Sequence, residues 1–274
     1  MTKIFYESFT PKHFNASRDD FKGNGAIGRY VFIPGSNQRA EFIAEKYFVN
    51  IVVRESPRGH NLYLGDMQYK GEIIQVAAIS TGMGAPSVDL ILSELIFLGA
   101  RRFLRIGTAG GMQDCISVGD VVFATGAVRD ESTSNNYIPR SFPAMADLDM
   151  TIEANSMSLD SLYKVHLGIV HSKDSLYARQ FLCGPSEQES IDLNQKMNAY
   201  GILATEMECA HIYVLSRLYS QELGVTIKAA CVLGVIAKAS EPFAAEKSLS
   251  EMAVSNAIDF GVSLFSRLAY KEII

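Results

Sequence analysis

The stretch FLRIGTAGG, from Phe103 to Gly111, places one arginine inside an apolar run that ends in glycines. Apolar residues on both sides of Arg105 predict a buried strand, and the glycines after Ile106 predict a turn. A charge buried without a partner costs several kcal/mol, so Arg105 needs a counter-ion or an edge position. Two alternatives stay open. Either Arg105 pairs with a carboxylate of the protein or lies on an edge strand, or it binds an anion from outside.

Short apolar runs alternate with longer amphipathic segments on both sides of this stretch. Such a pattern predicts an α/β fold with a central, largely parallel or mixed sheet flanked by helices. No linker rich in Pro, Gly or Ser divides the chain, which favours a single domain over residues 1–274. The polar segment Asp130–Arg140 predicts a surface loop. The expected strands are Tyr30–Pro34, Ile73–Ser80, Arg102–Ile106, Val118–Thr125, His166–His171 and Ile227–Ile236, and the expected helices are Gln38–Phe48, Ser87–Leu98, Glu187–Tyr200, Glu208–Tyr219 and Glu251–Tyr270.

The composition argues against several classes of protein. Of the 274 residues, 48% are hydrophobic, and a net charge of −5 without a basic run argues against nucleic acid or an anionic membrane as partner. The four cysteines have no C-x-x-C spacing and the histidines no metal-binding spacing. Neither a membrane span of roughly 18 apolar residues nor a secretory signal is recognisable. We expect a soluble, cytoplasmic protein without a metal site.

Three glycine-rich segments follow expected strands: PGSNQR (34–39), STGMGAPS (80–87) and IGTAGG (106–111). Each could be only a tight connection, because glycine permits unusual backbone angles. Two of them carry or follow an arginine, however. Main-chain N–H groups at a helix start, together with a guanidinium group, suit an oxyanion such as phosphate. The chain contains neither a Walker loop nor G-x-G-x-x-G.

These segments, together with ELIFLGARRFLRIGTAGG, SVGDVVFATGAVRD, SFPAMAD and TEMECA, occur in the same order and at similar spacing in a known family. From about His13 to about Ala239, the chain resembles the nucleoside phosphorylase-I family, and within it the uridine phosphorylases most closely. The resemblance implies a single α/β domain with a central mixed sheet. It also implies cleavage of a nucleoside by inorganic phosphate to a free base and ribose 1-phosphate in nucleoside salvage. It implies no cofactor, and homodimers or hexamers with shared active sites.

The resemblance implies a phosphate site made of two arginines, a glycine and a hydroxyl. The matching residues are Gly35, Arg39, Arg105 and Thr108. In the family, a third arginine comes from the neighbouring subunit. Arg58 matches it best, and Arg54 is the second choice because this loop differs in length. On this basis Arg105 is buried because its partner is the substrate anion.

The implied ribose site consists of Glu206, Met207 and Glu208, with His13 reaching the 5′ hydroxyl of a neighbour's ribose. In the family, the glutamate at the position of Glu208 accepts hydrogen bonds from the 2′ and 3′ hydroxyls. The methionine at the position of Met207 packs on the sugar. From the residues alone, two glutamates at a helix start could instead interact with the helix dipole. A histidine near the chain start could simply be solvated.

The implied base site departs from the family pattern. Gln180 matches the glutamine that pairs with a pyrimidine edge, but it could also be a surface residue. Leu182 replaces an expected arginine and Ala239 a further one, for which Arg179 or Lys238 could compensate. Purine-cleaving relatives place a proton-donating aspartate at the end of a late strand. Here the corresponding residues are Ile236 and Ala237, neither of which can donate a proton.

Phosphorolysis of a pyrimidine nucleoside, with uridine as substrate, is therefore the favoured function. Phosphate held by Arg39 and Arg105 would attack the sugar as the bond to the base breaks, while Glu208 orients the ribose. The alternatives are a purine nucleoside phosphorylase and a nucleoside-binding homologue impaired in catalysis. A nucleosidase that uses water is disfavoured, since such relatives lack the full arginine set and contain a catalytic aspartate.

Overall fold

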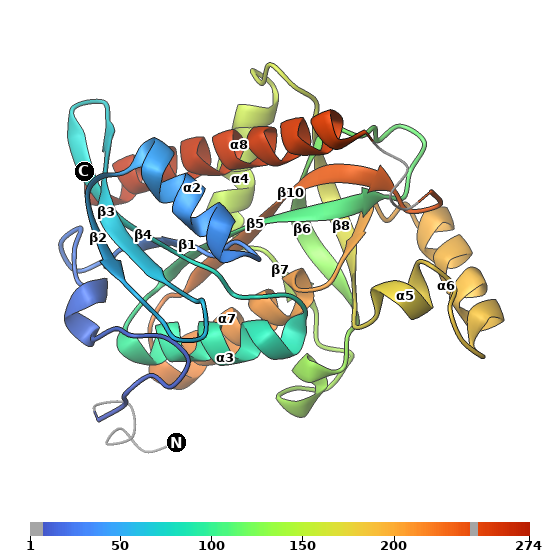
Figure 1. Cartoon of the computed structure of the whole chain (residues 1–274), viewed down its shortest axis with the longest axis horizontal. Helices are drawn as coiled ribbons and strands as arrows, with labels where there is room; N and C mark the ends of the chain where they lie inside the picture. Colours follow the sequence, from blue (N-terminus) through green and yellow to red (C-terminus); the bar gives the residue numbers. More distant parts are fainter. Residues whose placement is uncertain (1–7, 242–245) are drawn as a thin grey trace.

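One mixed β-sheet forms the centre of the computed structural model, which describes residues 8–241 and 246–274 (Figure 1). Residues 1–7, part of the segment in which no secretory signal was expected, lie outside the described residues. Helices cover both faces of the sheet, which confirms the predicted α/β fold. The strands are β1 Tyr30–Phe32, β2 Val49–Arg54, β3 Leu62–Tyr69, β4 Glu72–Ile79, β5 Arg102–Gly111, β6 Val121–Asp130, β7 Ala144–Met145, β8 Val165–Lys173, β9 Ala204–Glu206 and β10 Lys228–Lys238.

Part of this sheet closes on itself. The strand order is β10-β6-β8-β9-β5-β1-β4-β3-β2, and β10 also pairs with β5. Strands β5, β10, β6, β8 and β9 therefore form a closed ring, from which β1, β4, β3 and β2 extend as an open sheet. β10 runs parallel to β5 from Lys228 opposite Arg102 to Lys238 opposite Gly111. This pairing holds the central stretch of the sequence in the middle of the sheet.

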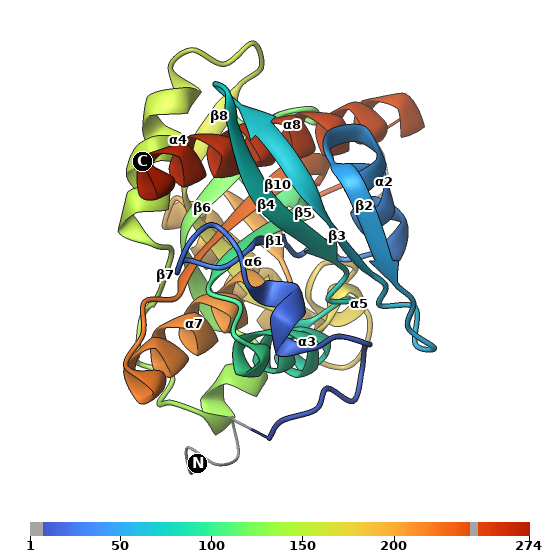
Figure 2. The ribbon, with the colours of Figure 1, turned by 90° about the vertical axis from the view of Figure 1, so that its left-hand side faces the viewer.

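The helices form two layers, and each layer encloses its own apolar cluster. α3 and α7 cover one face of the sheet and α2, α4 and α8 the other, an arrangement that both views show (Figures 1 and 2). The α-helices are α2 Asn37–Tyr47, α3 Ala85–Leu98, α4 Leu148–Ser158, α5 Leu176–Arg179, α6 Glu187–Ala199, α7 Cys209–Leu223 and α8 Lys247–Ile273, and the 3-10 helices are η1 Arg18–Phe21 and η2 Thr133–Asn136. Within the described residues, none of these helices is long and apolar enough to cross a membrane.

Local sequence signals explain where the helices begin and end. Ser36 caps α2, because its side chain accepts a hydrogen bond from the Arg39 N–H. Gly84 precedes α3, which has a proline in its first turn and ends at Gly99 with φ of 107°. This left-handed backbone conformation strongly favours glycine, and a residue that adopts it ends the helix. The expected helices thus match α2, α3, α6, α7 and α8 to within a few residues at each end.

The third glycine-rich segment was predicted wrongly as a turn. Gly107, Thr108, Gly110 and Gly111 all belong to β5, where they pair with β10, and the last two also pair with β9. Glycine is needed there for close packing. A Cβ at Gly107 would lie 2.9 Å from a Leu233 methyl carbon. The segment is therefore a crowded strand in the closed part of the sheet.

Other boundaries also differ from the expectations. β6 begins at Val121 and continues to Asp130, and the strands β2, β3, β7 and β9 were not predicted. Every residue of β2 is exposed, so this strand has no buried face to detect. The supposed surface loop Asp130–Arg140 contains buried Glu131 and Ser134. These residues lie beside Arg129, whose guanidinium group donates to the backbone carbonyls of the loop.

Candidate active site

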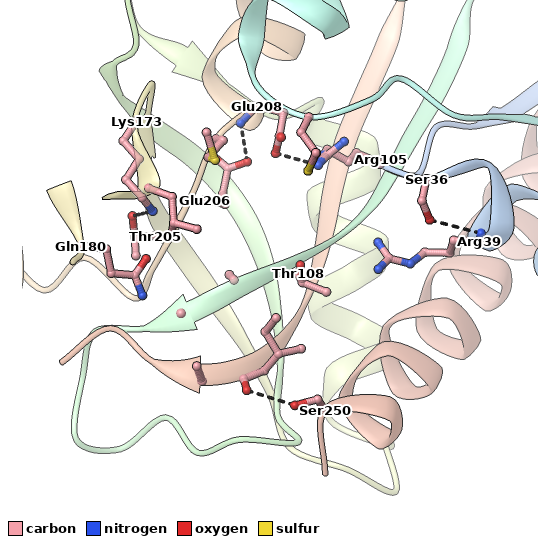
Figure 3. Close-up of a pocket in the computed structure, with 18 of the residues that line it drawn as sticks. Ser36, Arg39, Arg105, Thr108, Lys173, Gln180, Thr205, Glu206, Glu208 and Ser250 are labelled. Atoms are coloured by element: carbon pink, nitrogen blue, oxygen red, sulfur yellow. Dashed lines mark hydrogen bonds and ion pairs between the residues drawn. The ribbon is translucent and has the colours of Figure 1, made fainter. Parts of the chain in front are cut away.

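A cavity of about 410 Å³ opens where β5, β8 and β10 end and where α2 and α7 begin. Segments far apart in the sequence meet around it (Figure 3). The predicted site residues that line this cavity are Gly35, Arg39, Arg105, Thr108, Gln180, Glu206, Met207, Glu208, Ile236 and Ala237. The cavity is therefore the candidate active site.

Arg105 pairs with Glu208 inside the cavity wall. Side chains alternate along β5, so Arg105 faces α3 and α7 together with Phe103 and meets the start of α7. Its Nη2 lies 2.6 Å from Oε2 of Glu208, and Nη1 donates to the Thr81 hydroxyl at 3.2 Å. Both members of the pair are almost completely buried. The protein thus supplies a carboxylate partner, the first of the two alternatives.

The pair still leaves Arg105 able to bind an anion. Its buried Nε has no hydrogen-bond partner among the described residues. Burial lowers the pKa of Arg105, but the negative charges of Glu208 and Glu206 raise it by more, so the guanidinium group stays protonated. Oε1 of Glu208 accepts from the Gly84 N–H at 2.6 Å. Glu208 therefore links Arg105 to the second glycine-rich segment.

Arg39 brings a second guanidinium group into the same cavity. It extends from the first turn of α2 toward Thr108, and its Nη1 donates to the Ile106 carbonyl at 3.1 Å (Figure 3). Burial and the neighbouring charge of Arg105 lower the pKa of Arg39 to about 10, with Glu208 acting in the opposite direction. At neutral pH both arginines are charged. Two like charges held close together in a cavity favour a bound anion.

Glu206 has a structural partner at each oxygen. Its Oε2 accepts from the N–H groups of Glu208 and Cys209, at 2.7 and 2.9 Å, and its Oε1 accepts from the Ser172 hydroxyl. These contacts place a carboxylate at the N-terminus of α7, where the helix dipole favours negative charge. Glu206 thus caps α7, and Glu208 presents the more available carboxylate to the cavity.

The opposite end of the cavity combines apolar residues with two polar ones, Lys173 and Gln180. The Gln180 amide packs over β5, since a Cβ at Gly110 would lie 3.0 Å from its Nε2. Figure 3 places Lys173, Thr205 and Gln180 on one side of the cavity and Arg39 on the other. The lining residues that the sequence analysis did not select are Ser36, Met83, Ala109, Gly110, Lys173, Leu176, Phe181, Thr205 and Ser250.

Lys173 was missed although the sequence contains a signal for it. It lies two residues after the expected strand His166–His171 and in fact ends β8. A lysine that ends an apolar strand, just before the helix cap Ser175, resembles Arg105 in its position. The same argument that selected Arg105 could have selected Lys173.

Three predicted site residues lie outside the lining of this cavity. The ring of His13 contacts the buried Glu94 carboxylate, with 2.8 Å between Nδ1 and Oε1. Arg58 is exposed in the connection between β2 and β3. Leu182 has a φ of 57° and follows the lining residue Phe181. His13 and Arg58 were predicted to serve a neighbouring subunit, so their position in one chain does not test that role.

The two cations suggested as substitutes for the missing arginines are engaged elsewhere. Arg179 pairs with Asp130, with 3.0 Å between Nε and Oδ2. Lys238 donates to the backbone carbonyls of Gln113 and Ile116. Neither side chain lines the cavity, so neither compensates for Leu182 and Ala239. Within residues 8–241 and 246–274, no group of three His, Cys, Asp or Glu side chains could hold a metal ion.

Comparison with known proteins identifies the family. A family model described as the phosphorylase superfamily matches residues 29–265, and the chain belongs to this superfamily. The chain is 35% identical over 231 residues to uridine phosphorylase of Treponema pallidum (strain Nichols), covering 82% of this chain and 83% of that protein. It is 32% identical over 244 residues to a DeoD-type purine nucleoside phosphorylase of Latilactobacillus sakei, covering 87% and 96%.

Solved structures agree with this assignment. A crystal structure of uridine phosphorylase from Vibrio fischeri ES114, complexed with 6-hydroxy-1-naphthoic acid, matches with a TM-score of 0.78 and 26% identity. The match covers 97% of this chain and 98% of that one. The family and the likeness to uridine phosphorylases that the sequence motifs predicted are confirmed.

Proposed function

We propose that the protein cleaves a pyrimidine nucleoside, with uridine as substrate, by phosphorolysis to the free base and ribose 1-phosphate. The observation that supports this most directly is the joint placement of Arg39, Arg105 and Glu208 in one cavity. The relatives named uridine phosphorylase, at 35% and 32% identity, favour a pyrimidine. At the base end, neither Ile236 nor Ala237 offers the acid that a purine needs.

In the proposed complex, phosphate lies between the two arginines. The side chains of Arg39, Arg105 and Thr108 converge with Gly35 on one end of the cavity. Main-chain N–H groups at the start of α2 add donors at the positive end of the helix dipole. Since both guanidinium groups stay charged at neutral pH, phosphate meets two preformed cations.

The ribose lies beside Glu208 in this proposal. In the Glu208 carboxylate, Oε1 accepts from the Gly84 N–H and Oε2 accepts from Arg105. Each oxygen keeps a second lone pair, which can accept from a sugar hydroxyl. Met207 lines the same part of the cavity and supplies an apolar surface for the sugar ring. Holding the ribose here orients its anomeric carbon toward phosphate. As the bond to the base stretches, the phosphate charge stabilises the cationic sugar.

A second copy of the chain completes the site in our proposal, with Arg58 as its phosphate ligand and His13 as its contact to the 5′ hydroxyl. Arg54 is the weaker candidate, because its Nη2 pairs with Oδ1 of Asp20 at 3.0 Å. The edge strand β2 exposes Val49, Ile51, Val52 and Val53, each by 40–48%. Such an apolar edge favours coverage by a partner.

The direct test is phosphate-dependent release of base. Purified protein is incubated with uridine, deoxyuridine or thymidine, with and without phosphate, and free base is measured by ultraviolet absorbance. We expect release only with phosphate, and ribose 1-phosphate as the second product when uridine is cleaved. Release of equal size without phosphate would indicate a nucleosidase. No release from any of the three, with binding retained, would indicate a nucleoside-binding homologue.

A purine nucleoside is the second candidate, because the DeoD-type relative matches over 96% of its length. Inosine and adenosine in the same assay distinguish the two substrates. Turnover of inosine well above that of uridine would replace the pyrimidine proposal and leave phosphorolysis intact.

A further inference from the structure

Lys173 is a buried cation at the base end of the cavity, and the proposed mechanism so far gives it no role. It lines the cavity at the end of β8 and is only 2% exposed. Its Nζ donates to the Thr205 hydroxyl at 2.7 Å, the one hydrogen bond that this ammonium group makes among the described residues. An ammonium group has three N–H donors, so two remain for other acceptors. A bound base would bring such acceptors into the cavity.

A chain of hydrogen bonds holds Lys173 in place. Thr205 Oγ1 lies 3.1 Å from Nδ1 of His171, and Nε2 of His171 lies 3.1 Å from Oδ2 of Asp130. A carboxylate only accepts, so His171 donates from Nε2 to Asp130, and in that tautomer its Nδ1 accepts from the Thr205 hydroxyl. Thr205 then accepts from Lys173. The Thr205 hydroxyl and the His171 ring thus each donate to the next member of this hydrogen-bond network, and Lys173 keeps two N–H donors for a ligand.

The charges around Lys173 keep it available as a donor near neutral pH. Burial lowers the pKa of Lys173 to about 8, while Glu206, Glu208 and Asp130 act to raise it. These carboxylates belong to β9, the start of α7 and β6 respectively. Lys173 is the lysine among the lining residues, and the arginines that line the cavity belong to its other end.

We propose that Lys173 is a catalytic residue that donates a hydrogen bond to an exocyclic oxygen of the leaving base and stabilises its negative charge. This inference rests on the proposed phosphorolysis. It also accounts for the departures from the family pattern at Leu182 and Ala239, since a donor on β8 takes over the task of the missing arginines. Gln180 supplies the neighbouring amide to the same base edge.

The step balances without a further reactant. The bond between C1′ and the base nitrogen breaks, and its electron pair passes into the base, where the carbonyl oxygens share the charge. A phosphate oxygen forms the new bond to C1′. The ammonium group of Lys173 keeps its proton and offers it in a hydrogen bond to the charged oxygen. The base then takes a proton from solvent, and the hydrogen phosphate ester releases one.

This role also predicts the class of base. Ammonium and amide donors match carbonyl oxygens, which uracil and thymine present opposite the sugar. Cytosine presents an amino group at the corresponding position, which also donates. We therefore expect a base with an exocyclic oxygen there to react about a hundredfold faster than its amino counterpart, because the amino group leaves the Lys173 donor without an acceptor.

The test compares leaving groups in Lys173→Met. Lys164→Met is the matched control, because Lys164 is exposed just before the same strand and its Nζ donates to the Cys115 carbonyl, outside the cavity lining. With uridine, we expect kcat/KM of Lys173→Met to fall by about a hundredfold, the effect of removing one transition-state donor. With 5-fluorouridine, whose base is a better leaving group, the loss should be about tenfold or less. Lys164→Met should match the wild type on both substrates.

The pH profile gives a second readout. Wild-type kcat/KM should decrease as pH rises through about 8, because Lys173 then loses the proton that it donates. Lys173→Met should lack this decrease, and Lys173→Arg should shift it to higher pH. Thermal unfolding of each variant checks that the fold persists.

Two results would overturn the inference. One is an equal loss on uridine and 5-fluorouridine in a folded Lys173→Met protein, and the other is activity equal to that of the wild type. If the wild type itself releases no base with phosphate, the proposed function fails first, and the inference fails with it.

Discussion

The ion pair between Arg105 and Glu208 connects the proposed phosphate site to the proposed ribose site. Removing two charges from water costs several kcal/mol per ion, and the pair regains this only through close contact and further hydrogen bonds. Here the contact is 2.6 Å, and Thr81 and Gly84 supply the additional bonds. A hydrophobic pair could be equally stable, so the charges are better explained by binding than by folding.

Substitution of one or both partners separates these contributions. Glu208→Gln leaves a buried guanidinium group without its counter-ion, so we expect the free energy of unfolding to fall by about 3 kcal/mol. In the double variant Arg105→Leu with Glu208→Leu, stability should return to within about 1 kcal/mol of the wild type. Both proteins should lose phosphorolysis. Urea unfolding and base release measure the two effects, and a double variant no more stable than the single one would contradict this explanation.

The sequence predicted the arginines and Glu208 better than it predicted the base end. Arg39, Arg105 and Glu208 belong to motifs whose order and spacing are specific, and the structure places all three at one cavity. Lys173 has only a weaker signal, its place at the end of an expected strand, and Phe181 has none of its own. Their position depends on where β8 ends and where α5 turns, which a single sequence does not reveal to the residue. Glu206 shows the opposite problem, because its partners at the start of α7 are visible only in three dimensions.

At the scale of the element, β5 determines the shape of the cavity. Its glycines were taken for a turn because glycine weakens strands in general. In the structure they permit close approach from both sides, with Leu233 beside Gly107 and Gln180 beside Gly110. The strand thereby carries Arg105 and the three consecutive residues Thr108–Gly110 to the cavity. The absence of side chains at the glycines is what leaves room for Gln180.

Gly110→Ala tests this explanation. The new methyl group would lie 3.0 Å from the flexible end of Gln180, which must move, so we expect the KM for uridine to rise about tenfold with little loss of stability. In the Gln180→Ala background the same substitution should add almost nothing, because the clashing atoms are gone. Kinetics of the four proteins form a double-mutant cycle. Independent effects of the two substitutions would show that Gln180 does not occupy this place when substrate binds.

At the scale of the whole molecule, the closed ring of β5, β10, β6, β8 and β9 places the segments of the site around one cavity. This closure joins residues separated by more than a hundred positions, such as Leu233 and Val122, and no local pattern encodes such pairings. The sequence therefore predicted the fold class and most of the strands but not their order. The exposed strand β2 lies at the end of the sheet that is farthest from the closed ring in strand order. We place a second copy of the chain there.

Subunit mixing tests whether the site is shared. Arg58→Ala removes the arginine offered to the partner, and Arg39→Ala removes the one kept in the chain's own cavity. Each variant alone should be nearly inactive. In a homodimer with isologous symmetry, co-expression of both variants in equal amounts gives half mixed dimers, each with one intact site, and thus about a quarter of wild-type activity.

Arg54→Ala, whose arginine already pairs with Asp20, serves as the control and should keep full activity. An Arg58→Ala protein as active as the wild type would remove Arg58 from the site, and co-expressed variants without recovered activity would place both arginines in the same subunit's site.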